Sequence, residues 1–247
     1  MSQESRAAFA RAVRAEPVEL DLACLLIGAE VDPQLNAADG IARLDSLAEH
    51  VDLADFAVPA IRSVLRGFAG DADSYRDLRS SLLHEVLRRR TGLPILLSVV
   101  WLEVARRCGI AADGIGLPGH FIVRVDEQYV DPFSGGRTVD VDGVAPEHLR
   151  AWAGDEILLR ILTNIRVWAQ QSPGRIRERL WAVELSLLLP HHPAELRRER
   201  GTLLVRSGQF LAGAGDLEAY AEVVADTDPA VAGRILAEAR AARARLN

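Results

Sequence analysis

Apolar residues recur at helical spacing over much of the chain before residue 90. Between 20 and 68 the repeat is clearest in two stripes: Ile41, Leu44, Leu47, Ala48 and Val51, then Ile61, Val64, Leu65 and Phe68. Positions three and four apart share one face of a helix, so these stripes predict amphipathic helices. A loop over 70–74 separates them from a third stripe over 78–87, whose helix is expected to end near Thr91 and Gly92.

Pro94 begins a helix of a different kind. A proline in the first turn gives up only an amide that would have stayed unpaired, so it favours a helix start. The following residues, 95–105, are apolar nearly all round and leave few positions for water. This pattern predicts the central helix of its domain, ending at Gly109.

The apolar period then changes from helical to the two-residue alternation of strands. Three short runs, 114–117, 120–125 and 128–131, follow one another with a tight turn at Asp126 and Glu127. They predict a small antiparallel sheet, and Val139 to Val141 predict a further short strand.

From Pro146 onward the helical period returns, with stripes at Ile157, Leu158, Ile161, Leu162 and Ile165, and at Ile176, Leu180, Val183 and Leu187. Prolines at 190–193 interrupt it, and the sequence then predicts helices over 194–206 and 209–224 and from Pro229 onward. Paired helices joined by a short Gly turn are typical of tetratricopeptide arrays. Gly201, Gly208 and Tyr220 fall near marker positions of that repeat, whereas Gly213 stands where the repeat usually has Ala.

Composition narrows the functional classes. The chain has 247 residues, 49% of them apolar, with few aromatic residues and a formal net charge of −6. This charge argues against nucleic-acid partners, and the basic runs 88–90 and 197–198 are interpreted as solvated helix faces. The longest apolar stretch, 93–102, is too short to cross a bilayer, and no signal segment is recognised. Two widely separated cysteines, Cys24 and Cys108, favour reduced thiols and a cytoplasmic location.

His120 and Asp131 fall on neighbouring predicted strands that follow the central helix. Cysteine enzymes use this layout because a helix N-terminus lowers a thiol's pKa, an imidazole takes its proton, and a carboxylate orients the imidazole. The tight turn places His120 and Asp131 near each other, but the alternation alone does not prove that they share a face.

Five runs carry a resemblance to a known family. They lie in one order along most of the chain: RRRTGLPILLSVVWLEVARRCGI (88–110), GIGLPGHFIVRV (114–125), YVDPFSGGR (129–137), LLRILTNIR (158–166) and RRERGTLLVRSGQFLAGAGDLEAY (197–220). The chain resembles the bacterial SirB-type transglutaminase-like proteins. The resemblance implies a mostly helical α+β fold: N-terminal helices (1–70), a papain-like core with a small antiparallel sheet (71–154) and a tetratricopeptide-like helical tail (155–247).

Carried over by motif, the family's catalytic His and Asp match His120 and Asp131, and the nucleophile position falls on Pro94. Active relatives have Gly-x-Cys where this chain has Gly92, Leu93 and Pro94, and SirB-type members commonly share the proline. Proline removes the thiol and also a backbone amide that serves an oxyanion hole.

Other residues could replace the missing cysteine nucleophile, and their positions argue for or against each one. Ser98 lies one turn beyond Pro94, but a Ser in an apolar helix usually bonds back to a carbonyl. Cys108 lies at the wrong end of the helix dipole, and both it and Cys24 are interpreted as core residues. His84 and Glu85 are interpreted as a solvated pair, with Glu85 alternatively facing the site. His148 as a third metal ligand beside His120 and Asp131 has no recognisable ligand spacing.

The sequence therefore predicts a non-catalytic protein that binds a peptide or protein partner, with no cofactor, no metal, no nucleic acid and no membrane. Its groove is expected to include Pro94, Ser98, Gly119 and Phe133 beside His120 and Asp131, and the helical tail to add a concave docking surface. The opposing hypothesis is a hydrolase or acyl-transfer enzyme of altered mechanism, in which His120 activates water and Asp131 orients it.

Overall fold

The computed structural model describes residues 3–54 and 56–245, and it is 62% helical with one small sheet. The chain divides into two compact units, Met1–Ile161 and Leu162–Asn247, and α7 (Gly154–Gln170) crosses the division. The sequence-based division at 70 and 154 stays a prediction, and its first and last segments include residues outside the described ranges. The mostly helical α+β fold with its small antiparallel sheet is confirmed.

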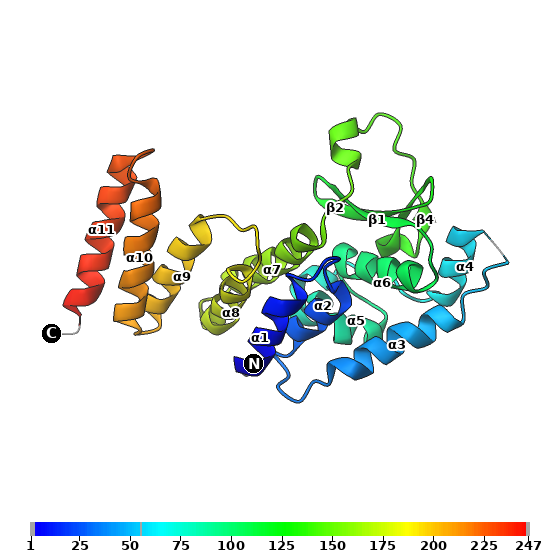
Figure 1. Ribbon diagram of the computed structural model, residues 1–247, viewed down its shortest axis with the longest axis horizontal. Helices are drawn as coiled ribbons and strands as arrows, with labels where there is room; N and C mark the ends of the chain where they lie inside the picture. The colour runs from blue at the N-terminus through cyan, green and yellow to red at the C-terminus, as the bar shows by residue number, and fades with distance from the viewer. Residues whose placement is uncertain (1–2, 55, 246–247) are drawn as a thin grey trace. The chain divides into compact units, whose positions relative to one another are not determined.

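Helices make up most of the first unit (Figure 1). Phe9, Leu25 and Leu44 have no exposed surface, as the helical stripes require. The helices before the sheet are α1 (Gln3–Ala12), α2 (Leu20–Gly28), α3 (Ala37–Glu49), α4 (Ala57–Val64), α5 (Leu83–Arg89) and α6 (Pro94–Arg107).

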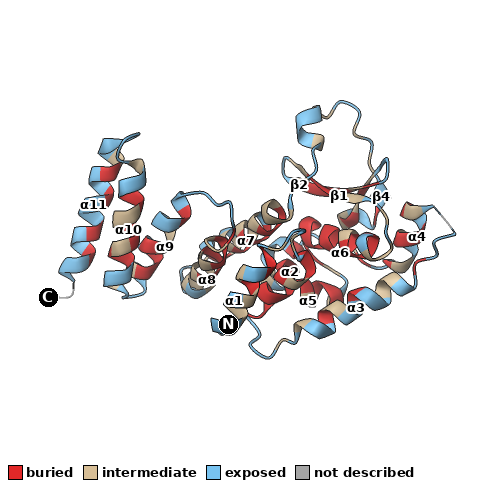
Figure 2. Cartoon of the chain, viewed as in Figure 1, coloured by how far each residue is buried: buried red, intermediate tan, exposed pale blue. Residues whose placement is uncertain are grey.

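The central helix is α6, as predicted. Pro94 is its first residue, and Figure 2 shows buried residues along most of its length. Gly109 adopts φ +69° after the last turn, and the Ile110 amide donates to the Ala105 carbonyl at 2.9 Å. This is a Schellman ending, which needs a left-handed residue at the glycine position.

A four-stranded antiparallel sheet packs against α6. Its strands follow one another in space as in sequence: β1 (Ala112–Leu117), β2 (His120–Val125), β3 (Gln128–Asp131) and β4 (Arg137–Thr138). The three consecutive residues Phe121, Ile122 and Val123 are all buried. Because neighbouring strand residues point to opposite faces, both faces of β2 are covered.

Two predicted elements differ from the structure. The stripe from residue 78 is two pieces, η2 (Leu78–Ser81) and α5, because the extended Leu82 separates them. The helix then ends at Arg89 rather than near Gly92, and Arg90 takes the left-handed conformation at φ 58°. Thr91 pairs with Ala69, so the chain has already left the helix before the glycine.

The predicted strand over Val139 to Val141 is also wrong. Pairing ends at Thr138, and the Val139 amide makes a last bond to the Tyr129 carbonyl at 2.8 Å. The Asp140 side chain then accepts from the Asp142 amide, which turns the backbone away from the sheet.

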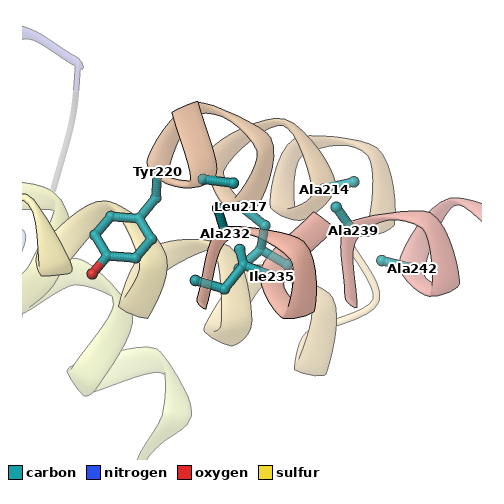
Figure 3. Packing of buried hydrophobic residues seen from close by; sticks show 8 residues of the cluster. Ala214, Leu217, Tyr220, Ala232, Ile235, Ala239 and Ala242 are labelled. Atoms are coloured by element: carbon teal, nitrogen blue, oxygen red, sulfur yellow. The ribbon is translucent and has the colours of Figure 1, made fainter. Parts of the chain in front are cut away.

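The second unit is helical, and its last three helices match the predicted ranges within one residue. Four helices follow α7. They are α8 (Ile176–Ser186), α9 (Glu195–Arg206), α10 (Phe210–Val224) and α11 (Pro229–Ala244). A close backbone contact explains why residue 213 is Gly where the repeat usually has Ala. A Cβ there would lie 2.7 Å from the Gly201 carbonyl oxygen. Figure 3 shows Leu217 of α10 with Ile235 and Ala239 of α11 in the shared core.

Candidate functional site

His120 and Asp131 meet on adjacent strands. The register pairs Val123 with Val130, so His120 lies diagonally across β2 and β3 from Asp131. The His120 Nε2 atom is 3.0 Å from Asp131 Oδ1, which shows that both side chains point to the same side. The His120 side chain is 32% exposed and that of Asp131 14%, so solvent reaches the imidazole more readily than the carboxylate.

Asp131 is held by more than the imidazole. Its Oδ1 accepts from the Phe133 amide at 2.9 Å and its Oδ2 from the Ser134 hydroxyl at 2.7 Å. These bonds cap the short η3 turn (Pro132–Ser134). Burial would raise the pKa of Asp131, but the bonds from His120, Ser134 and Phe133 outweigh it and hold that pKa below its ordinary value. The carboxylate is thus both an orienting partner and a turn cap.

Phe133 forms one wall beside the imidazole. Its ring meets that of His120 edge-on with centroids 6.2 Å apart, and Tyr75 lies 6.3 Å from it on the other side. The Phe133 carbonyl accepts from the Gly70 amide at 2.9 Å, and a Cβ on Gly70 would lie 1.7 Å from the ring. The Gly70 position therefore has to be a glycine for Phe133 to sit where it does.

The start of α6 is a closed structure. The Leu93 amide donates to the Ser80 carbonyl at 2.9 Å, and Pro94 and Ser98 are buried. The Ser98 hydroxyl has no hydrogen-bond partner among the described residues, so it does not make the expected bond back to a carbonyl, and the Ser80 hydroxyl is likewise unpaired. Gly119 is exposed at φ +75° in the β1–β2 turn. Of the predicted groove residues, Gly119 and Phe133 reach solvent, while Pro94 and Ser98 lie beneath the surface.

The alternative nucleophiles are placed unfavourably. Burial and the nearby carboxylates of Glu103 and Asp21 raise the pKa of Cys24 well above its ordinary value. Burial also raises the pKa of Cys108, which follows the last turn of α6. Neither thiol is prone to ionise at neutral pH.

The remaining candidates are His84, Glu85 and His148. Glu85 bonds to Arg88 at 2.7 Å, and burial lowers the pKa of His84. His148 is exposed in η4 (Pro146–Leu149). Within residues 3–54 and 56–245, no group of three or more His, Cys, Asp or Glu side chains is arranged to hold a metal ion.

Sequence reasoning missed a buried ion network beside the last turns of α6. Arg107 bonds to Asp21 and to Glu103, each at 2.6 Å, and Arg106 reaches Glu103 at 2.8 Å. Burial and the charge of Asp21 raise the pKa of Glu103 despite these arginines. The i, i+3 and i, i+4 spacing of Glu103 to the arginines was visible in the sequence, whereas the contact with α2 was not.

The geometry of the pair allows one kind of chemistry. With Nε2 engaged by Asp131, the other ring nitrogen, Nδ1, is the atom able to accept a proton in the neutral tautomer. A base of this kind assists attack by a thiol or by water, and the described residues place no ionisable thiol at the start of α6. No helix in the described part of the chain is both long and apolar enough to span a bilayer.

Two family models match consecutive parts of the chain. A model of the transglutaminase-like superfamily matches residues 38–169, and a model of the tetratricopeptide repeat matches residues 165–247. No solved structure matches the chain.

Three relatives show how far the likeness extends. A UPF0162 protein of Xylella fastidiosa is 32% identical over 243 residues, which cover 86% of each chain. A UPF0162 protein of Pseudomonas aeruginosa is 34% identical over 181 residues, or 67% of this chain and 63% of that protein. Mouse F-box only protein 21 is 31% identical over 111 residues, which are 39% of this chain but 18% of that protein. The chain therefore belongs to the transglutaminase-like superfamily and to the UPF0162 protein family.

Proposed function

We propose that this protein is a non-catalytic, SirB-type transglutaminase-like protein of the cytoplasm that binds a peptide or protein partner. The observation that carries the proposal is Pro94 at the first position of α6. The family resemblance puts the nucleophilic cysteine there, and a proline supplies neither a thiol nor a backbone amide. Acyl transfer through a cysteine thioester therefore lacks the sulfur atom that would attack the substrate.

The surface around His120 supports binding rather than turnover. Phe133 and Tyr75 offer aromatic area beside a polar imidazole, and the Tyr75 ring is 52% exposed. Aromatic side chains next to a hydrogen-bonding group are typical of peptide-contacting surfaces. Gly119 is exposed at the beginning of β2, so no side chain blocks the approach from that side.

The helical tail supports the same function. A tetratricopeptide region presents several helix faces and commonly serves as a scaffold on which a partner chain lies. Together the two parts favour a role in protein interaction over one in metabolism.

One observation favours a second function, a hydrolase of altered mechanism. The 3.0 Å contact orients the imidazole as a general base would need, and the imidazole is partly exposed. In that case His120 would take a proton from water, and Asp131 would hold the ring in place.

Site-specific photocrosslinking tests the binding function. A benzoylphenylalanine replaces Phe133 in the full chain, and irradiation of cells that express it is expected to give a discrete crosslinked partner. The yield should fall when His120→Ala is added. Val31, 47% exposed after α2, is the matched control position and should give no such product. Equal labelling at both positions, or none at Phe133, contradicts the proposal.

An activity screen separates the two functions. Amidase, esterase and deamidase substrates are offered to the wild-type protein and to His120→Ala. We expect no turnover by either protein. Turnover that disappears in His120→Ala would overturn the non-catalytic assignment and establish the hydrolase.

A further inference from the structure

Three cavities on the tail adjoin at one residue. Their volumes are about 80, 210 and 220 Å³, and Arg206 lines all three. Arg179 and Leu203 line two of them, and Thr202 lines another pair. Their lining residues all lie within 169–245, inside the second unit. We call the joined cavities the α9 groove, because Thr202, Leu203 and Arg206 belong to that helix.

The α9 groove is basic on a chain whose net charge is −6. Five arginines line it, against three glutamates: Arg175, Arg179, Arg198, Arg206 and Arg245, against Glu195, Glu199 and Glu238. Glu199 is already bound by Arg179 at 2.6 Å and by Arg166. Positive charge is therefore in excess in the groove.

Two of these arginine side chains have no partner among the described residues. Arg198 and Arg206 are exposed, and neither guanidinium makes a hydrogen bond or an ion pair with another described residue. Arg179 and Arg175 differ, because Arg179 bonds to Glu199 and Arg175 stacks on the Trp168 ring at 3.9 Å. The groove thus holds two guanidinium groups that are free to bind an external anion.

The spacing of these arginines limits the shape of the anion. They are eight residues apart on α9, which is about 12 Å along a helix axis, with Thr202 midway on the same face. An extended peptide advances roughly 3.3 Å per residue, so side chains four residues apart are about 13 Å apart and share one face. Two acidic side chains at that spacing match Arg198 and Arg206.

Next to Arg206 the groove becomes apolar. Val205, Leu217 and Ala242 line the cavity of about 220 Å³ between α9 and α11. Arg206, Arg245 and Glu238 also line this cavity. Its apolar wall accepts an aliphatic side chain, a group that a phosphate backbone lacks. Glu195 and Glu238 at its margins also oppose a continuous polyanion.

We propose that the α9 groove binds an extended acidic peptide of a partner protein, with carboxylates four residues apart on Arg198 and Arg206 and an aliphatic side chain beside Val205 and Leu217. The proposal rests on the interaction role proposed above and names the chemistry of the partner segment. Arginine is suited to this task because its guanidinium binds a carboxylate through two parallel hydrogen bonds.

Fluorescence anisotropy on the full chain tests the proposal. The probe is a fluorescein-labelled peptide of sequence GLDASADLG, and the matched probe GLNASANLG lacks the two charges. We expect Arg206→Gln and Arg198→Gln each to weaken binding of the acidic peptide at least tenfold, and added salt to weaken it in the wild type. Arg240→Gln, an exposed arginine of α11 that lines none of the three cavities, is the control and should change affinity less than twofold.

Three results would overturn the proposal: equal binding of the two peptides, unchanged binding by Arg206→Gln, or displacement of the acidic peptide by a single-stranded RNA decamer at lower concentration than by unlabelled peptide. Thermal midpoints should not change in Arg198→Gln and Arg206→Gln, since neither side chain has a partner to lose. The test is independent of the core site. Failure here leaves the crosslink at Phe133 standing, and loss of that crosslink leaves peptide binding at Arg206 unaffected.

Discussion

The first unit contains two clusters in which a carboxylate meets a cationic or basic side chain, and the two differ in how far solvent reaches them. In the network of Arg107, Asp21 and Glu103, the side chains are 10%, 11% and 4% exposed. In the pair of His120 and Asp131, the His120 side chain is 32% exposed to solvent. The first joins α6 to the distant α2, whereas the second joins the consecutive strands β2 and β3.

The difference lies in what each cluster leaves free. The Arg107 guanidinium donates to Asp21, Asp45 and Glu103, so no donor remains to bind a ligand. His120 has one ring nitrogen bound to Asp131 and the other unbound among the described residues. The closed network has no donor left over, whereas the half-open pair leaves one ring nitrogen available for the binding role proposed above.

The largest expected effect comes from opening the closed network. Arg107→Ala leaves the buried carboxylates of Asp21 and Glu103 near each other, with the exposed Arg106 as the remaining cation of the network. Removing one partner of a buried ion pair costs about 3–5 kcal/mol, and we expect a loss of that size in the free energy of unfolding measured with urea.

Arg106→Ala is the matched control for this substitution. Its side chain is 59% exposed, so its contacts with Glu103 and Asp21 are screened and their loss should cost at most about 1 kcal/mol. Equal losses for the two variants would contradict the distinction between closed and open clusters.

The next effect concerns the role of Asp131 as a turn cap. Asp131→Ala removes the acceptor of the Phe133 amide and the Ser134 hydroxyl, and hydrogen bonds to a charged group contribute about 1.5–3 kcal/mol. We expect a loss of about that size at neutral pH, measured by urea unfolding.

This contribution should depend on pH in one direction. The folded pKa of Asp131 lies below its ordinary value of 3.8. Its stabilisation is therefore fully present above the unfolded pKa and is lost as the pH falls through the folded one. The difference between wild type and Asp131→Ala should shrink below about pH 4. A difference that grows toward acid would show that the carboxylate is not held ionised.

A third effect tests the loop that follows the pair. Gly135 and Gly136 both have positive φ, 71° and 75°, but only at Gly136 would a Cβ meet a side chain, that of Trp101 at 2.3 Å. Overpacking costs about 1–3 kcal/mol, so Gly136→Ala should lose that much more stability than Gly135→Ala. Equal thermal and urea midpoints for the two variants would mean that the loop does not pack on α6.

The smallest effect on stability is expected at the residue proposed to matter most for binding. His120→Ala removes a partly exposed partner, and such pairs contribute at most about 1 kcal/mol. Urea unfolding should show a small change, while photocrosslinking at position 133 should be lost. A large loss of stability would make His120 a structural residue like Arg107.

Much of the fold was predictable because the signals were local. The apolar run after Pro94 predicted α6, the change of period predicted three strands, and the Asp126–Glu127 turn allowed His120 and Asp131 to meet. The elements that failed have two kinds of cause: the strand expected over 139–141 is ended by a local turn at Asp140, whereas the helix before α6 depends on a distant partner. The helix before α6 ends early because residue 91 pairs with Ala69, a contact that no local pattern indicates.

The contacts of the site were also only partly predictable from local sequence patterns. Sequence placed His120 and Asp131 on neighbouring strands, but their 3.0 Å contact depends on the β2–β3 register. The expected carbonyl bond of Ser98 is absent, and its buried hydroxyl has no partner among the described residues. The link from Arg107 to Asp21 joins α6 to α2, and only the fold reveals it.

The central claim is that Pro94 occupies the nucleophile position of an otherwise oriented His–Asp pair, and Pro94→Cys tests it most directly. Alkylation by iodoacetamide is followed at each cysteine by peptide mass spectrometry, with and without His120→Ala. A thiol at a helix N-terminus has a lowered pKa, so we predict that the introduced thiol reacts faster than Cys24 and Cys108 and that His120→Ala slows it. Equal rates at all three positions, or a rate indifferent to His120, would contradict the account.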